Sequence, residues 1–173
     1  MKRLFFLDGS YYDVEEPYCR GCFMNHNEHL MPFYIYPVFE KEGVVVRQDA
    51  EWPIPGFYII SIREHIGSFD CIDSKTRAMI CELLFWIRKG IREKLGVERA
   101  QIYHEEKISS PHFHIWILPL WEDIMSKTRI QPKIYESNIK QYIDSFHFEE
   151  TKSKILKCNE IMKEYLNTVM ANE

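Results

Sequence analysis

The middle of the chain alternates short apolar runs with polar turns. Residues 33–39 and 43–47 are rich in β-branched and aromatic side chains, and the polar segment 40–43 separates them. This pattern predicts a β-hairpin. The next segment, 51–56, holds two prolines and a glycine, which rule out regular structure. We expect a loop there, followed by a third strand over residues 57–62.

A helix is predicted after the third strand. Asp73 or Ser74 can cap its first turn, and Gly96 is a plausible stop. Apolar side chains then recur at helical spacing, at Ile80, Leu84, Ile87, Ile91 and Leu95. Gly90 interrupts the pattern at a cost of about 1 kcal/mol relative to alanine, a cost that close packing can explain. Two more strands are expected beyond the helix, over residues 100–104 and 112–118, with the polar loop 105–111 between them.

The two ends of the chain have different patterns. Residues 1–32 mix charged, aromatic, Cys and His positions without a clear period, so we expect a loop-rich segment. The last 45 or so residues are expected to be helical, with an apolar stripe on an otherwise charged helix. The stripe consists of Ile155, Cys158, Met162, Tyr165 and Val169. It needs a partner surface, either this domain or a second subunit.

These elements predict an α+β domain. The order of three strands, a helix and two strands leaves one helical crossover in an antiparallel sheet of about five strands. We expect a single domain over residues 1–173, because a chain of 173 residues with 46% hydrophobic content can bury one sizeable core. Its core would span about 33–120, between the N-terminal segment 1–32 and a helical extension over about 129–173.

Charge and composition exclude some partners. A net charge of -4 and an isoelectric point near 6.0 argue against a basic nucleic-acid-binding face. There is no apolar run of about 18 residues, so we expect no membrane span. The first residues have too short an apolar run for a signal peptide. We therefore expect a cytoplasmic protein, and in that reducing compartment a Cys-x-x-Cys pair indicates metal or redox chemistry.

Two histidines are expected on one face of the strand predicted over residues 112–118. Because side chains alternate along a strand, that face would hold His112, His114, Trp116 and Leu118. The opposite face would hold Phe113, Ile115 and Ile117. A bare His-x-His is a weak signal, since the same residues can simply be polar groups on a solvated face.

Cys19 and Cys22 have the two-residue gap of a zinc knuckle. A redox pair, or two unrelated loop cysteines, are the alternatives. Redox pairs usually open a helix after a strand, and the surrounding segment lacks a preceding strand pattern, so we favour metal. His26 and His29 are near in sequence and are one candidate set for the remaining ligands.

The segment 109–114, Ser-Ser-Pro-His-Phe-His, resembles the Ser-x-Pro-His-x-His segment of galactose-1-phosphate uridylyltransferases. The wider stretch resembles the histidine-triad (HIT) superfamily, whose pattern is His-x-His-x-His followed by apolar residues. Asp49, the proline-containing loop, the strand over 57–62 and His65 match the order and spacing of that family. The resemblance covers about 38–120, and the cysteine pair lies where zinc-containing members carry theirs.

The resemblance implies roles for these residues. His114 would attack the α-phosphorus of a nucleotide and form a covalent nucleotidyl-histidine, which water or a second phosphate then resolves. Ser109 would donate a hydrogen bond to the leaving group or to a phosphate, and Asp49 would bind ribose hydroxyls. A structural Zn²⁺ would be held by Cys19, Cys22, His65 and His112. The partner would be a nucleotide or nucleotide-sugar small molecule, and since family members commonly pair, we predict a homodimer.

Three positions qualify this assignment. Trp116 stands where the family has histidine or glutamine, and an indole can donate only one hydrogen bond. His104 stands near a family asparagine, where it either binds the phosphate or caps a strand. Lys107 is a candidate for phosphate contact. The leading hypothesis is a nucleotide hydrolase or nucleotidyltransferase; the alternatives are a catalytically silent HIT-fold binding protein and a zinc module in which His112 and His114 both bind metal.

Overall fold

The computed structural model describes residues 1–106, 108, 111–122, 125–126 and 142–171. Its centre is an antiparallel sheet of five strands, in the order β3-β4-β5-β7-β6. The strands are β3 (Pro37–Lys41), β4 (Val44–Gln48), β5 (Tyr58–Ile62), β6 (Ala100–His104) and β7 (His114–Pro119). One long helix, α2 (Ser74–Glu93), connects β5 with β6. The α+β fold class expected from the sequence is confirmed.

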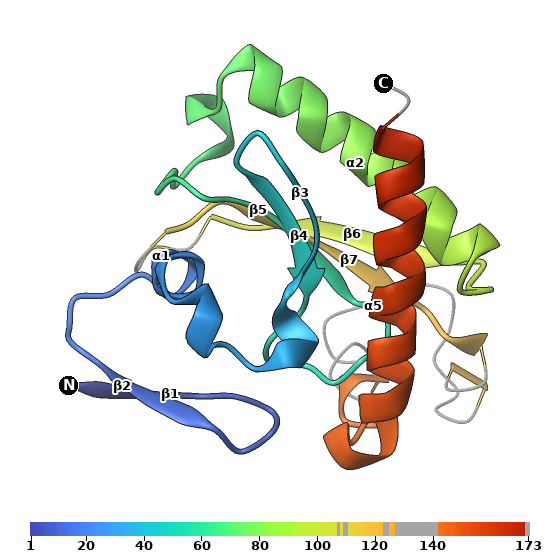
Figure 1. Ribbon diagram of the computed structural model, residues 1–173, viewed down its shortest axis with the longest axis horizontal. Helices are drawn as coiled ribbons and strands as arrows, with labels where there is room; N and C mark the ends of the chain where they lie inside the picture. Colours follow the sequence, from blue (N-terminus) through green and yellow to red (C-terminus); the bar gives the residue numbers. More distant parts are fainter. Residues whose placement is uncertain (107, 109–110, 123–124, 127–141, 172–173) are drawn as a thin grey trace.

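The helix α2 has the predicted start. Asp73 is its N-cap, and the carboxylate accepts hydrogen bonds from the backbone N–H groups of Lys75 and Thr76. Gly96, at a φ of 71°, follows the helix in the left-handed conformation that favours glycine. Figure 1 shows the sheet between α2 on one side and the N-terminal segment on the other.

The alternation expected along β7 is confirmed. Phe113, Ile115 and Ile117 belong to the core between the sheet and the two long helices. Trp116 and Leu118 point to the opposite face, where they join a separate apolar cluster. His112 itself lies outside the strand, because β7 begins only at His114.

The N-terminal segment differs from the loop that we expected. It forms a two-stranded hairpin, β1 (Lys2–Phe5) with β2 (Tyr11–Val14), followed by the short helix α1 (Arg20–His26). Asp8-Gly9 in the connection is a recognised turn pair, and Gly9 has a φ of 83°. The sequence pattern did not predict these two strands, because each is only four residues long and buries a single side chain.

The first predicted strand of the sheet also starts later than expected. Two 3-10 turns, Glu28–Leu30 and Phe33–Ile35, precede β3, and a third one, Phe69–Cys71, precedes α2. The aromatic run at 33–35 therefore serves as a turn that buries Tyr34 and Ile35. The run is apolar because it packs in the core beside α1, and periodicity alone does not separate that role from a strand.

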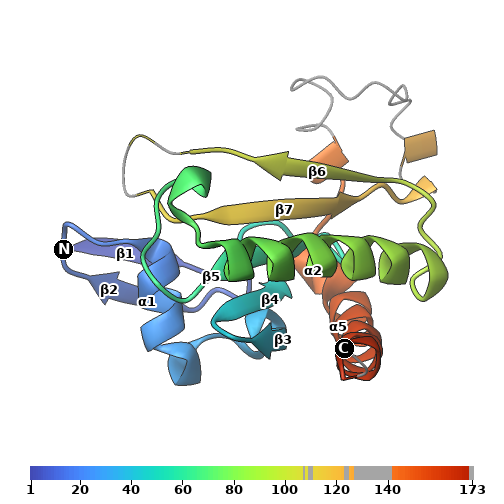
Figure 2. The ribbon, with the colours of Figure 1, turned by 90° about the horizontal axis from the view of Figure 1, so that it is seen from above.

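The C-terminal helix α5 (Phe148–Met170) buries its apolar stripe on this same domain. Ile155 packs against the N-terminal segment, while Met162 and Tyr165 pack against α2 and the sheet. Figure 2 shows α5, seen nearly along its axis, next to α2. A Cβ on Gly90 would lie 2.8 Å from atoms of both Met162 and Tyr165, so the glycine allows this close approach.

Because α5 is covered within the chain, the stripe gives no support to a homodimer, which stays a prediction. Residues 129–141 of the predicted C-terminal extension lie outside the described residues. Among the described helices, none is both long and apolar enough to cross a membrane.

Candidate active site and metal cluster

His112 is positioned by a hydrogen bond to the end of β5. Its Nε2 lies 2.8 Å from the carbonyl oxygen of Ile62, and a carbonyl can only accept, so Nε2 carries the proton. The other ring nitrogen, Nδ1, is then unprotonated in the neutral ring. Burial lowers the pKa of His112, which favours this neutral form. A neutral imidazole with a fixed tautomer is the form that binds a metal ion.

Four potential ligands converge at this ring. The donor atoms of Cys19, Cys22, His65 and His112 all lie within 4.8 Å of one another. The Sγ of Cys19 is 3.3 Å from Nδ1 of His112, and the Sγ of Cys22 is 3.2 Å from Nδ1 of His65. In a tetrahedral zinc site, sulfur and nitrogen ligands lie about 3.6 Å apart. The spacing and the donor types therefore fit Zn²⁺.

The structure modifies the argument against a redox pair. Cys19 is the N-cap of α1, so the cysteine pair does open a helix, and β2 precedes it. Burial and the neighbouring Cys19 raise the pKa of Cys22 to about 11, whereas a redox cysteine usually has a lowered pKa. His26 and His29, the alternative ligand set, are not part of the cluster found in the described residues.

Two residues of α1 hold the cluster against the sheet, and the sequence alone did not single them out. A Cβ on Gly21 would lie 2.6 to 2.9 Å from ring atoms of His112, so only glycine lets the helix approach this ring. Asn25 donates to the carbonyl oxygens of Ile62 and Arg63 and accepts from Arg47 of β4. The available signal for Gly21 was its place between the two cysteines.

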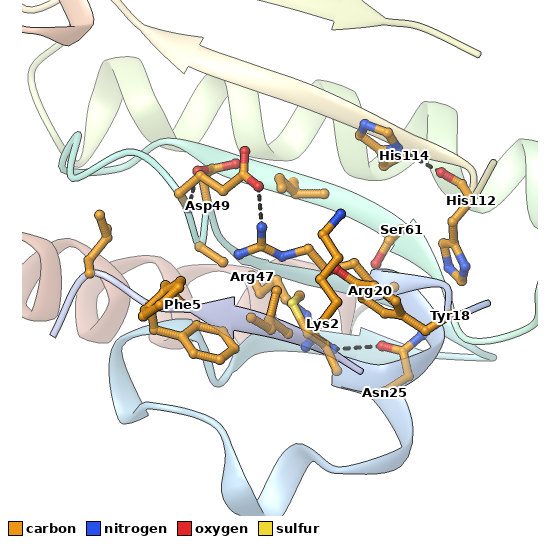
Figure 3. A pocket seen from close by; sticks show the side chains of 18 of the residues that line it. Lys2, Phe5, Tyr18, Arg20, Asn25, Arg47, Asp49, Ser61, His112 and His114 are labelled. Carbon is orange, nitrogen blue, oxygen red and sulfur yellow. Dashed lines mark hydrogen bonds and ion pairs between the residues drawn. The ribbon is translucent and has the colours of Figure 1, made fainter. Parts of the chain in front are cut away.

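His114 begins β7 beside this cluster. Its Nδ1 lies 2.6 Å from the carbonyl oxygen of His112, which makes Nδ1 the donor and leaves Nε2 unprotonated in the neutral ring. Ser61 of β5 lies directly opposite in the sheet. His112, His114 and Ser61 all line one large cavity (Figure 3).

The cavity has a volume of about 1170 Å³, which is ample for a small-molecule ligand. One wall is the face of the sheet, formed by Ile59, Ser61, His114 and Trp116. The N-terminal hairpin and α1 form the other wall, with Lys2, Phe5, Tyr18 and Arg20. Ser61 and the hairpin are contributions that the sequence analysis did not identify; a lone serine within an apolar strand was the only signal for Ser61.

Trp116 lies in the cavity wall next to His114. The two ring centroids are 4.2 Å apart, and the rings meet edge to face at 82°. Trp52 is a further aromatic neighbour, with its centroid 6.3 Å from that of Trp116. Trp116, at the third histidine position of the His-x-His-x-His pattern, therefore contributes an aromatic surface beside the imidazole of His114.

Asp49 lies in the same cavity and is 4% exposed. Its Oδ1 accepts hydrogen bonds from the backbone N–H groups of Glu51 and Trp52, both at 2.7 Å. Burial raises the pKa of Asp49 to about 6. Burial of a carboxyl lowers the stability of its charged form, so a buried carboxyl in a cavity wall is a candidate ligand contact.

One of the predicted residues, His104, is not brought into this site, and two others lie outside the described residues. His104 donates from Nδ1 to the carbonyl oxygen of His114 at 3.0 Å, and its ring packs on Phe113, on the opposite face of the sheet. It is not one of the described residues that line the cavity, so the geometry favours strand capping. Lys107 and Ser109 lie outside the described residues.

No family model matches this sequence, and no curated protein matches it either. Solved structures do match its fold. A hypothetical histidine triad nucleotide-binding protein from Sulfolobus tokodaii gives a TM-score of 0.61 at 20% identity, covering 87% of this chain and 93% of that one.

Two further structures agree. A zinc-bound histidine triad family protein from Mycobacterium smegmatis gives a TM-score of 0.56 at 13% identity, covering 90% of this chain and 97% of that one. A HIT family protein from Bacillus anthracis gives 0.53 at 14% identity, covering 82% and 96%. The chain has the histidine-triad fold.

The raised pKa of Asp49 predicts a specific pH dependence. In the folded protein the pKa of this carboxyl is about 6, above its ordinary value of 3.8. The folded state therefore binds the proton more tightly than the unfolded state does. The contribution of the carboxyl to stability is therefore full below about pH 4 and is lost as the pH rises through 6. Relative to Asp49→Asn, the free energy of unfolding of the wild type should fall between pH 4 and 8, by at most about 3 kcal/mol.

Urea unfolding at several pH values measures this difference. Asp73→Asn is the control, because hydrogen bonds lower the pKa of Asp73 below its ordinary 3.8, so its contribution to stability is lost only at lower pH and the corresponding difference should change little between pH 4 and 8. A pH-independent difference for Asp49→Asn would show that this carboxyl is not perturbed.

Proposed function

We propose that this chain, with its histidine-triad fold, is a nucleotide hydrolase or nucleotidyltransferase that uses His114 as its nucleophile. The observation that carries the proposal is the hydrogen bond from Nδ1 of His114 to the carbonyl oxygen of His112, at 2.6 Å. It makes Nε2 the unprotonated nitrogen of the neutral ring, in a residue that lines a ligand-sized cavity. The description of the Sulfolobus tokodaii protein as nucleotide-binding supports the choice of ligand class.

In the proposed reaction, Nε2 of His114 attacks the α-phosphorus. The N–P bond forms while the bond from phosphorus to the leaving-group oxygen breaks, and the leaving-group oxygen takes a proton from solvent, to which the attacking water of the second step returns one. Water, or an acceptor phosphate, then displaces the histidine and releases the nucleotide. Asp49 would bind the ribose hydroxyls from the same cavity. Ser109 is proposed to donate a hydrogen bond to the leaving group, a role that rests on the sequence resemblance.

We also propose that the cluster of two cysteines and two histidines holds a structural Zn²⁺. Four protein donors leave no open position, which is typical of a structural site. The zinc would join the N-terminal segment, through Cys19 and Cys22, to the strand that carries His114. The zinc-bound relative from Mycobacterium smegmatis supports this proposal. An interaction module with both histidines on the metal is disfavoured, because His114 is not part of the cluster found in the described residues.

The second candidate function is a catalytically silent nucleotide- or protein-binding domain. Trp116 is the observation that favours it, because the indole offers a single donor where the family has a group with more hydrogen-bonding capacity. The protein would then bind nucleotides and never turn them over. A nucleotide-sugar ligand, transfer rather than hydrolysis, a homodimer and a cytoplasmic location all remain predictions from the resemblance and the composition.

Trapping the intermediate tests the proposed nucleophile. Wild-type protein is incubated with an α-labelled dinucleoside polyphosphate and, separately, with an aminoacyl-adenylate, then quenched in base and analysed by mass spectrometry. We expect a nucleotide adduct on His114. His114→Ala should lack the adduct and lose at least about 10³-fold in turnover, because the attacking group is gone.

His29→Ala is the matched control, since that histidine is exposed and outside the cluster and the cavity. It should keep both adduct and turnover. Nucleotide binding by the wild type with neither adduct nor turnover would favour the silent domain instead.

Substitutions around the cluster test the zinc proposal. We expect about one zinc per wild-type chain and none in Cys22→Ser. Gly21→Ala should lower the zinc affinity at least about tenfold, because the new Cβ displaces the His112 ring. Metal analysis and competition with a chelator measure these effects. Cys81→Ser, at an exposed cysteine outside the cluster, is the control and should bind zinc normally; a full zinc equivalent in Cys22→Ser would contradict the assignment.

A further inference from the structure

Among the described cations that line the cavity, one forms no ion pair with a described carboxylate. Among the described residues, the lysine and arginine side chains that line it are Lys2, Arg3, Arg20 and Arg47. Each arginine has an acidic partner. The ion pairs are Arg3 with Asp13, Arg20 with Glu51 and Arg47 with Glu28.

Lys2 differs from these arginines. Its ammonium group lies over the ring of Tyr18, 5.8 Å from the centroid, and forms no ion pair with the described residues. Figure 3 shows its side chain extending from the hairpin into the cavity that His114 and Ser61 also line. A lysine that lies over an aromatic ring and forms no ion pair there is available to an anionic ligand.

Deepening the proposed function, on which this inference rests, we propose that Lys2 binds a phosphate group of the nucleotide held beside His114. The chain as a whole is acidic, with a net charge of -4, so attraction for phosphate must come from a local cation. Trp116 supplies at most one hydrogen bond there and no charge. Lys2 supplies the missing positive charge, and the hairpin that carries it becomes part of the ligand site.

The pairing of the arginines decides against them for this role. A phosphate bound to Arg20 competes with Glu51 for the same guanidinium group. Arg47 is 1% exposed, and it bonds Asn25 beneath α1. Lys2 binds an anion without breaking an ion pair.

A comparison of nucleosides with nucleotides tests the inference. The four ribonucleoside 5′-monophosphates and the matching nucleosides are titrated separately into the full chain by calorimetry, with any tag at the C-terminus. For the monophosphates that the wild type binds, Lys2→Gln should weaken affinity about tenfold at low salt. Affinity for the nucleosides should change less than about twofold, and Lys2→Arg should restore most of the phosphate affinity.

Lys89→Gln is the matched control. Lys89 also lies over an aromatic ring, that of Trp86, but on α2 and outside the residues that line the cavity. It should bind both ligand types as the wild type does. Equal monophosphate affinity in wild type and Lys2→Gln would overturn the inference, and so would an equal loss for nucleosides, which indicates a disturbed hairpin.

Adduct formation on His114, measured with the same proteins, separates this inference from the proposed function. An adduct together with unchanged phosphate affinity in Lys2→Gln overturns only the role of Lys2. Phosphate binding that depends on Lys2, without any adduct, supports the role of Lys2 and overturns the nucleophile. A wild type that binds no nucleoside phosphate overturns both.

Discussion

His112 connects the two parts of the site, which are the cluster of two cysteines and two histidines and the cavity that His114 lines. The ring donates from Nε2 to the carbonyl oxygen of Ile62 and presents Nδ1 to the thiols of Cys19 and Cys22. The backbone carbonyl of the same residue accepts the hydrogen bond from His114. The orientation of the proposed nucleophile is therefore set by the residue that the proposed zinc would hold. A shift of the His112 carbonyl would therefore change the direction of the His114 ring.

The cavity exists because the N-terminal segment packs over one face of the sheet. Gly21 allows α1 to approach the His112 ring, and the hydrogen bonds of Asn25 fix the helix to the end of β5. The hairpin before α1 then covers His114 and Asp49 and contributes Lys2. The same segment thus holds the cluster and forms a wall of the ligand cavity, which explains how a structural metal would influence ligand binding.

The sequence predicted the features that depend on local pattern. Alternation placed Phe113 and Ile115 in the core and Trp116 on the cavity face, and the family resemblance selected the four residues that the fold brings together as a cluster. Features that depend on tertiary contacts were missed. The hairpin has short strands with little periodicity, and Ser61 becomes a site residue only through its pairing with His114. The candidate phosphate contact at Lys107 stays a prediction, because that residue lies outside the described part of the chain.

The tautomer of His114 is the most direct test of the arrangement at His112. Nitrogen chemical shifts of the His114 ring report which nitrogen carries the proton. They are recorded by NMR on zinc-loaded protein, at a pH high enough for the ring to be neutral. The hydrogen bond to the His112 carbonyl predicts a proton on Nδ1 and none on Nε2. A neutral ring protonated on Nε2 would contradict the account, because the nitrogen at the cavity would then have no lone pair to attack phosphorus.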